Sequence, residues 1–96
     1  MSTASSVEVR HNERDQCFEA SVPGGTAVAC YRRQGDTLLM THTEVPAALQ
    51  GQGIAGVVVG AALAHARREG LKVRPLCSYV ATYMRRHPET RDLLAD

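Results

Sequence analysis

A glycine-rich segment, Gln50-Gly51-Gln52-Gly53-Ile54-Ala55-Gly56, separates a strand-like stretch from a helix-like stretch. The first turn of a helix leaves four backbone N–H groups without partners and carries a positive partial charge. Glycines at that point let the backbone approach a phosphate group closely. The segment therefore indicates an anion cradle, and the alternative is a tight strand-to-helix turn with no ligand.

Two nucleotide-binding motifs that use similar glycines are excluded. The spacing Gly51-x-Gly53-x-x-Gly56 matches a dinucleotide fingerprint, but that site requires an acidic residue about 20 positions later. Leu76 and Cys77 occupy that place. A P-loop is excluded because no Gly-Lys-Ser or Gly-Lys-Thr follows the glycines.

Cys77 and His42 are the candidates for acid–base chemistry. Cys77 falls between a predicted strand and a predicted helix, where free amides and the helix dipole lower the pKa of a thiol. His42 precedes the glycine segment, and its imidazole can take a proton from an ammonium group or assist a thiol at neutral pH. The structural alternatives are a buried, unreactive Cys77 and a hydrogen-bonded, non-catalytic His42.

The other cysteines and histidines are assigned no chemistry. Cys17 and Cys30 lie inside predicted strands and are expected to be packing residues. Three cysteines without a CxxC pair favour free thiols in a reducing compartment over a disulfide framework. The four histidines lack an HxxxH or HxxE spacing, so no metal site is expected.

Strand patterns fill the first half of the chain and helix patterns the second half. Alternating or apolar runs between turn residues predict four strands, over 7–11, 17–22, 26–32 and 37–45. Alanine-rich spacing with basic residues just before Gly70 predicts a helix over 53–69. The elements predicted after it are a strand over 71–76, a helix over 79–87 and one or two turns over 88–94. This order indicates an α+β domain whose first four strands form an antiparallel meander.

Length and composition indicate one small globular domain. The chain has 96 residues, of which 44% are hydrophobic and 22% charged, so we expect a single domain over 7–96 after a disordered lead-in over 1–6. A net charge of +1 gives no basic footprint for nucleic acid. No apolar run approaches the roughly 20 residues that cross a bilayer, and no signal-peptide core is present. We therefore expect a soluble cytoplasmic protein, for which a monomer is a suitable state.

The glycine segment and its surroundings resemble the GNAT superfamily of N-acetyltransferases. Gln50-x-x-Gly53-x-Ala55 matches the Q/R-x-x-G-x-G/A pyrophosphate motif of that superfamily. The runs that match its minimal, stand-alone members in order and spacing are residues 42–46, 51–55, 66–67, 70–73, 75–80, 83 and 87–89. The likeness extends from residue 9 to residue 94, which is nearly the whole chain.

The resemblance implies a GNAT-like α+β fold in which a mixed, mostly antiparallel sheet opens between its fourth and fifth strands. Coenzyme A is expected in that cleft, with acetyl-CoA as the co-substrate and no metal. Glu44 and Val45 are expected along the pantetheine arm, and a backbone N–H near Val45 would hold the oxyanion. The residues expected at the phosphates and along the rest of the cofactor are Gln50, Gly51, Gln52, Gly53, Ile54, Ala55, Tyr83 and Arg86.

The resemblance also implies transfer of an acetyl group to an amine, with Cys77 and His42 as catalytic residues. Either the amine attacks directly, with His42 or water as base and Cys77 as acid, or Cys77 is acetylated first. Tyr79 and Tyr83 share one helix face and are alternative acids. The rival hypothesis is a non-catalytic module that binds CoA or acyl-CoA as a sensor or docks onto a partner.

The acceptor side departs from the larger family members. Their domains have two helices between the first and second strands, and those helices build much of the acceptor pocket. This chain has only residues 12–15 at that place. We therefore expect an acceptor site that is open or completed by a partner, and an acceptor that is a protein, peptide or small-molecule amine.

Overall fold

A computed structural model describes residues 7–95, so the lead-in predicted over 1–6 lies outside the described residues. The strands are β1 (Arg10–Asn12), β2 (Cys17–Val22), β3 (Gly25–Gln34), β4 (Thr37–Glu44) and β5 (Lys72–Pro75). The helices are α1 (Ile54–Arg68) and α2 (Ser78–Arg86), with 3-10 turns η2 (Ala47–Leu49) and η3 (Pro88–Leu93). Every predicted element is present, and β1 differs most in extent because it begins three residues later than predicted.

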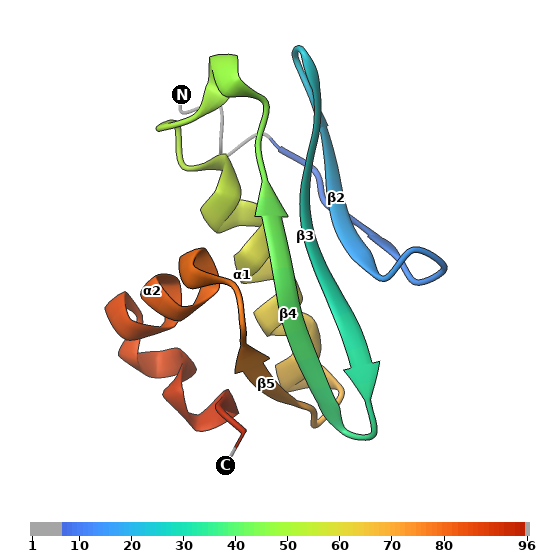
Figure 1. The fold of residues 1–96 in the computed structure, drawn as a ribbon, viewed down its shortest axis with the longest axis vertical. Coiled ribbons are helices and arrows are strands. Elements are labelled where there is room, and N and C mark those ends of the chain that lie inside the picture. The colour runs from blue at the N-terminus through green and yellow to red at the C-terminus, as the bar shows by residue number, and fades with distance from the viewer. Residues whose placement is uncertain (1–6, 96) are drawn as a thin grey trace.

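The five strands form one sheet in the order β1-β2-β3-β4-β5 (Figure 1). The first four are antiparallel neighbours, as predicted, and β5 is parallel to β4. A parallel pair needs a crossover connection, and α1 supplies it. The result is the mixed, mostly antiparallel sheet that the family resemblance implied.

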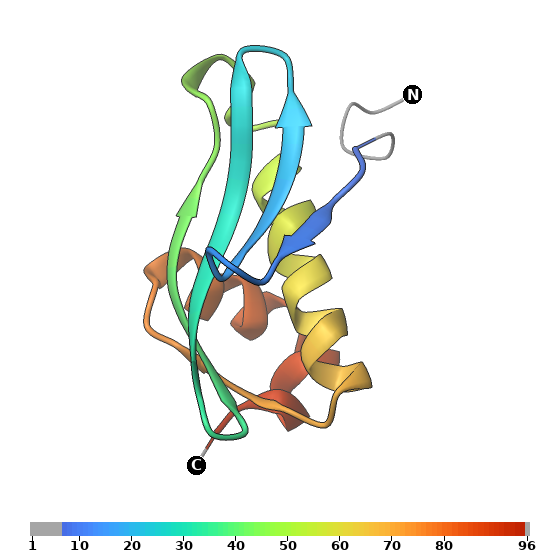
Figure 2. The ribbon, with the colours of Figure 1, turned by 90° about the vertical axis from the view of Figure 1, so that its right-hand side faces the viewer.

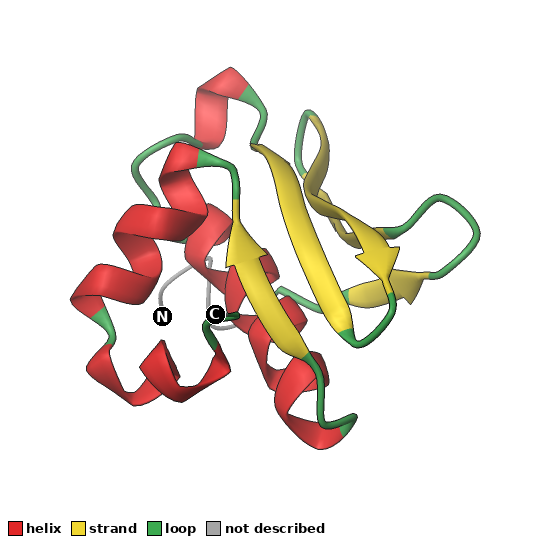
Figure 3. Cartoon of the chain, turned by 60° about the horizontal axis from the view of Figure 1, so that its bottom comes forward, coloured by secondary structure: helices red, strands yellow, loops and turns green. Residues whose placement is uncertain are grey.

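Helix α1 packs across one face of the sheet, which we call the inner face (Figure 2). The opposite face, the outer face, is covered by no helix in the part of the chain that the structure describes (Figures 1 and 2). Figure 3 shows the helices gathered to one side of the strands. The inner face therefore packs against helix α1, whereas the outer face is open to solvent in the described residues.

Small side chains let α1 lie close to the inner face. Ala20, Ala27 and Ala29 are fully buried on β2 and β3, and Ala62 and Ala66 are fully buried on α1. Larger buried residues complete this core, namely Phe18, Tyr31, Leu38, Met40, Ile54, Val58, Val59, Leu63, Val73, Val80 and Met84. Close packing of this kind fixes the position of α1, and so the position of the glycine segment before it.

Helix α1 ends as its sequence predicts. Gly70 has a φ of +69° and follows a last turn that contains Arg67 and Arg68. The Leu71 N–H donates to the Ala66 carbonyl at 2.8 Å, which closes the helix end. Arg67 also makes two hydrogen bonds to the Asp92 carboxylate, at 2.8 and 3.0 Å, and these tie η3 to α1.

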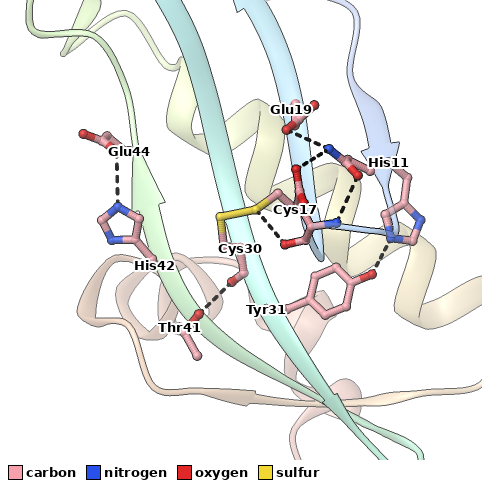
Figure 4. Close-up of a disulfide and its surroundings, with 10 residues drawn as sticks. His11, Cys17, Glu19, Cys30, Tyr31, Thr41, His42 and Glu44 are labelled. Atoms are coloured by element: carbon pink, nitrogen blue, oxygen red, sulfur yellow. Dashed lines mark hydrogen bonds and ion pairs between the residues drawn. A yellow bond between two sulfur atoms is a disulfide. The ribbon is translucent and has the colours of Figure 1, made fainter.

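The expectation that all three cysteines are free thiols is wrong. Cys17 and Cys30 lie directly opposite each other on β2 and β3, with 4.1 Å between their Cα atoms, and a disulfide joins them (Figure 4). Spacing in the sequence did not reveal the pair, because the strand register brings the two residues together. Cys77 is the free cysteine of residues 7–95, and the premise for a reducing compartment is lost.

No helix within residues 7–95 has both the length and the apolar character needed to cross a bilayer. Within the same residues, no group of three or more His, Cys, Asp or Glu side chains is placed to hold a metal ion.

Candidate active site

A β-bulge decides which residues of β4 face each side of the sheet. Met40 pairs with Tyr31 and His42 pairs with Cys30, so Thr41 is an extra residue between two consecutive pairs. Side chains alternate along a strand, and one extra residue exchanges the two faces beyond it. Met40 is therefore buried on the inner face, whereas His42 lies on the outer face.

Strands β4 and β5 separate next to this bulge. Their last pair is Met40 with Pro75. The N–H groups of Leu76 and Cys77 both donate to the Met40 carbonyl, at 3.1 and 2.9 Å, and the chain then turns into α2. Residues 41–44 of β4 consequently have no β5 neighbour, and this gap is the opening predicted between the fourth and fifth strands.

Cys77 lies at the start of α2, on the inner side of this gap. Its Sγ is 3.7 Å from Thr43 Oγ1, and the side chain is half-buried. Burial raises the pKa of the Cys77 thiol, but hydrogen bonds from the first turn of α2 and from Thr43 outweigh it and leave the pKa below its ordinary value. The thiol is therefore more readily ionised than a free cysteine.

His42 lies on the other side of β4 from Cys77. Its side chain is 60% exposed on the outer face, and its Nε2 is 3.4 Å from a carboxylate oxygen of Glu44 (Figure 4). Within residues 7–95, His42 contacts Glu44 and the Cys77 thiol contacts Thr43, and no hydrogen bond joins His42 to Cys77. The geometry therefore does not favour His42 as an assistant to the thiol. The two candidates flank the gap from opposite faces.

The glycine segment forms a turn that only glycine adopts easily. Gly51 and Gly53 have φ values of +87° and +81°. Helix α1 starts at Ile54 with no side-chain cap, and its first helical hydrogen bond runs from the Val57 N–H to the Gly53 carbonyl. The earlier amides of the helix are left for a ligand.

A cavity of about 360 Å³ lies beside this uncapped helix end. Its lining residues are Thr43, Val45, Leu49, Gln50, Gly51, Gly53, Ile54, Ala55 and Tyr79. Gln50 closes one wall, because its Nε2 donates to the Val45 carbonyl at 3.2 Å. Of the residues predicted for the cofactor, Glu44 and Gln52 line neither this cavity nor the hollow that continues from it, and Glu44 lies on the outer face.

A second hollow of about 380 Å³ continues from the first between α1 and α2. The two share Gly53 and Tyr79, and the second is also lined by Gly56, Val57, Thr82, Tyr83, Arg86 and His87. Tyr83 and Arg86, which the sequence assigned to the cofactor, thus lie along this groove. Burial raises the pKa values of Tyr79 and Tyr83, so both phenols carry protons at neutral pH.

Two glycines on α1 make room for the tyrosines of α2. A Cβ at Gly56 would lie 3.5 Å from atoms of both Tyr79 and Tyr83, and a Cβ at Gly60 would lie 3.1 Å from the Tyr83 hydroxyl. Tyr83 also stacks on His87, with 3.9 Å between the ring centroids. The groove is therefore lined by glycines of the α1 side and by the aromatic rings of Tyr79 and Tyr83 on α2.

A family model described as GCN5-related N-acetyl-transferase matches residues 17–93 of the chain. The chain belongs to the GCN5-related N-acetyltransferase (GNAT) family. Protein NATD1 of Xenopus tropicalis is 34% identical over 91 residues, which are 92% of this chain and 84% of that protein. Protein NATD1 of Homo sapiens is 34% identical over 85 residues, which are 85% of this chain and 75% of that protein.

A solved structure supports the GNAT fold independently. The solution structure of a GCN5-like protein from Staphylococcus aureus superimposes with a TM-score of 0.74 over 95% of this chain and 90% of that chain. The two sequences are 23% identical, so this match speaks for the fold alone. The family resemblance seen in the sequence and the predicted fold are both confirmed.

The residues of this GNAT domain fit the coenzyme A that the family typically uses. Uncapped amides at the start of α1 suit a pyrophosphate, and Arg86 adds a positive charge farther along the groove. The open edge of β4 suits an extended arm that carries amide groups. The sequence did not identify Thr43, Leu49, Thr82 or His87 as groove residues. It named Tyr79 only as an alternative acid, although its helical spacing from Tyr83 put both tyrosines on one face of α2.

Proposed function

We propose that the chain is an acetyl-CoA-dependent N-acetyltransferase that acetylates an amine. The observation that carries the proposal is the separation of β4 from β5 at Met40, directly beside the uncapped end of α1. That arrangement offers an open strand edge and an anion cradle within one continuous groove. Family membership supports the acetyltransferase class, and the amine acceptor is our inference.

The inner side of the sheet is assigned to the cofactor. The amides at the start of α1 would hold the pyrophosphate, and the exposed edge of residues 41–44 would hydrogen-bond the pantetheine arm. Bound acetyl-CoA supplies an activated acetyl thioester. A backbone N–H near Val45, in the wall of the cavity, would stabilise the negative charge that develops on the carbonyl oxygen.

The two candidate catalytic residues would act from opposite faces of the sheet. On the outer face, His42 takes the proton that the attacking amine loses, and the Glu44 carboxylate lies 3.4 Å from its Nε2. On the inner face, Cys77 donates its proton to the sulfur that leaves. Direct transfer is favoured over an acetylated Cys77, because the open groove would expose a thioester on that thiol to water.

A thiol-release assay tests the proposal. Purified protein is incubated with acetyl-CoA and a panel of amines and peptides, and free CoA thiol is measured for the wild type, His42→Ala and Cys77→Ala. We expect each variant to lose roughly 10²-fold in turnover, the usual scale for lost acid–base assistance. The control His65→Gln changes a histidine away from the groove and should keep wild-type turnover.

Coenzyme A binding, measured as a thermal shift, separates an enzyme from a binding module. We expect all three variants to keep the wild-type shift, because none of the replaced side chains is assigned to the phosphates. Equal thiol release from the wild type, His42→Ala and Cys77→Ala would overturn the catalytic roles. Binding of CoA without any release across the panel would favour the sensor hypothesis.

A further inference from the structure

The outer face is open around the β4–β5 gap. The connection between β1 and β2 is a turn of four residues, 13–16, and no helix covers this face within residues 7–95 (Figures 1 and 2). His42 and Glu44 are 60% and 68% exposed there. An acceptor that reaches His42 must therefore approach over the strands.

Strand pairing arranges the outer face in rows that run across the sheet. The first row is Arg10, Glu19, Val28 and Glu44. The second row is Asn12, Cys17, Cys30 and His42. The third row is Arg32, Leu39 and Arg74. The first row therefore has two carboxylates and one arginine, the second row has no lysine, arginine or carboxylate, and the third row has two arginines.

These rows give the outer face a negative end at Glu44 and a positive end at Arg32 and Arg74. Glu44 gives the His42 end of the face a negative charge, while Arg10 and Glu19 of the same row form their own pair at 3.9 Å. The third row presents two arginines on either side of the half-buried Leu39. Because the row of His42 is two residues from the third row along β3, about 7 Å separates them, and about 13 Å separates the first row from the third.

We propose that the acceptor is a polypeptide amine followed within a few residues by carboxylate side chains, and that it docks on the outer face. The inference rests on the proposed function. An ammonium group would be drawn to Glu44 and His42, and carboxylates one or two residues farther along an extended chain would reach Arg32 and Arg74. A small amine would contact only one end of this face, and a lysine- or arginine-rich segment would be repelled by the third row.

Six matched peptides test the proposal. Three have a free N-terminus and no lysine, with aspartate, asparagine or arginine at positions two to four. The other three have a capped N-terminus and one central lysine, flanked by the same residue types. Acetyl transfer to each is measured as thiol release and as peptide mass, with the wild type, Arg32→Glu, Arg74→Glu and the control Arg14→Glu, whose position is in the β1–β2 turn.

We expect at least one aspartate peptide to be acetylated with a kcat/KM about tenfold above its asparagine partner, and the arginine peptides to be poorer still. Arg32→Glu and Arg74→Glu should reverse this order mainly through KM, while Arg14→Glu should keep it. Added salt should weaken the preference. Unchanged thermal shifts with CoA in the variants would show that the cofactor side is intact.

Three results would overturn the inference. Equal rates for the aspartate and asparagine peptides, or a preference for arginine, would remove it and leave the N-acetyltransferase proposal standing. Acetylation of small amines but of no peptide would do the same. If the protein binds CoA but releases no thiol with any peptide or small amine, the proposed function is overturned and this inference with it.

Discussion

Cys77 and Thr43 meet across the point where β4 and β5 separate, with 3.7 Å between Sγ and Oγ1. The contact joins the start of α2 to the open edge of β4, so a substitution at either residue changes the surroundings of the other. It also contributes to the lowered pKa of the thiol, together with the hydrogen bonds from the first turn of α2 that outweigh the effect of burial.

Thr43→Val should raise the pKa of Cys77, because it removes one hydrogen bond that stabilises the thiolate. We expect alkylation by iodoacetamide to slow at neutral pH and its pH profile to move to higher pH. The disulfide leaves Cys77 as the free thiol of residues 7–95, so reduction must be avoided during the assay. Thr41→Val, whose hydroxyl bonds the Cys30 carbonyl instead, is the control. Equal alkylation profiles for both variants would show that Thr43 does not tune the thiol.

Gly53→Val should abolish the thermal stabilisation by CoA, because a side chain at this turn would crowd the phosphate cradle. The position has a φ of +81°, so the variant should also lose stability by about 1–3 kcal/mol without ligand. Gly70→Val is the matched control, since Gly70 has a φ of +69° at the far end of α1. It should lose similar stability but keep the full shift. A full CoA shift in folded Gly53→Val would move the phosphate site elsewhere.

Gly60→Ala should have different effects on stability in the wild type and in a Tyr83→Phe background. Alanine is favoured over glycine inside a helix by about 1 kcal/mol, but here its Cβ would lie 3.1 Å from the Tyr83 hydroxyl. In the wild type we expect the crowding to cancel or exceed that gain. Combined with Tyr83→Phe, the same substitution should stabilise the protein. Urea unfolding of the four proteins in this cycle measures the coupling, and additive changes would show that α1 and α2 do not touch there.

Stability should fall as the solution is acidified through the range where histidine titrates. Burial lowers the pKa of His11, the nearby His65 lowers it further, and Glu13 opposes both. The folded state therefore binds fewer protons than the unfolded state below about pH 6.5, which makes folding less favourable as pH falls. His11 stacks on Phe18 at 4.1 Å and bonds Tyr31 at 2.6 Å. His11→Gln should flatten the fall in melting temperature between pH 7.5 and pH 5.5, and an identical slope would assign it to other groups.

Local chemistry made the elements of this fold predictable. Basic residues followed by Gly70 marked the end of α1, and the glycines around Gly53 marked its start. Pro46 follows the end of β4, as expected from a residue that cannot donate to a sheet. These signals act within a few residues of each other, so a single sequence contains them.

Pairing across the sheet was not predictable in the same way. The Cys17–Cys30 disulfide depends on the register of β2 and β3. The position of His42 on the outer face depends on a bulge at Thr41, where the alternation of the sequence shows no break. The sequence therefore identified Cys77 and His42 as candidates but did not show that β4 stands between them.

The extra residue at Thr41 changes which positions of β4, even-numbered or odd-numbered, face helix α1. Before it, even-numbered positions such as Met40 point toward α1, and after it odd-numbered positions such as Thr43 do so. Deleting this one residue would exchange the two sets of side chains beyond it without altering any of them. Insertion or loss of a single codon in β4 can thus exchange cofactor-side and acceptor-side residues among relatives of this protein. A sequence alignment with a misplaced gap in β4 would compare residues from opposite sides of the sheet.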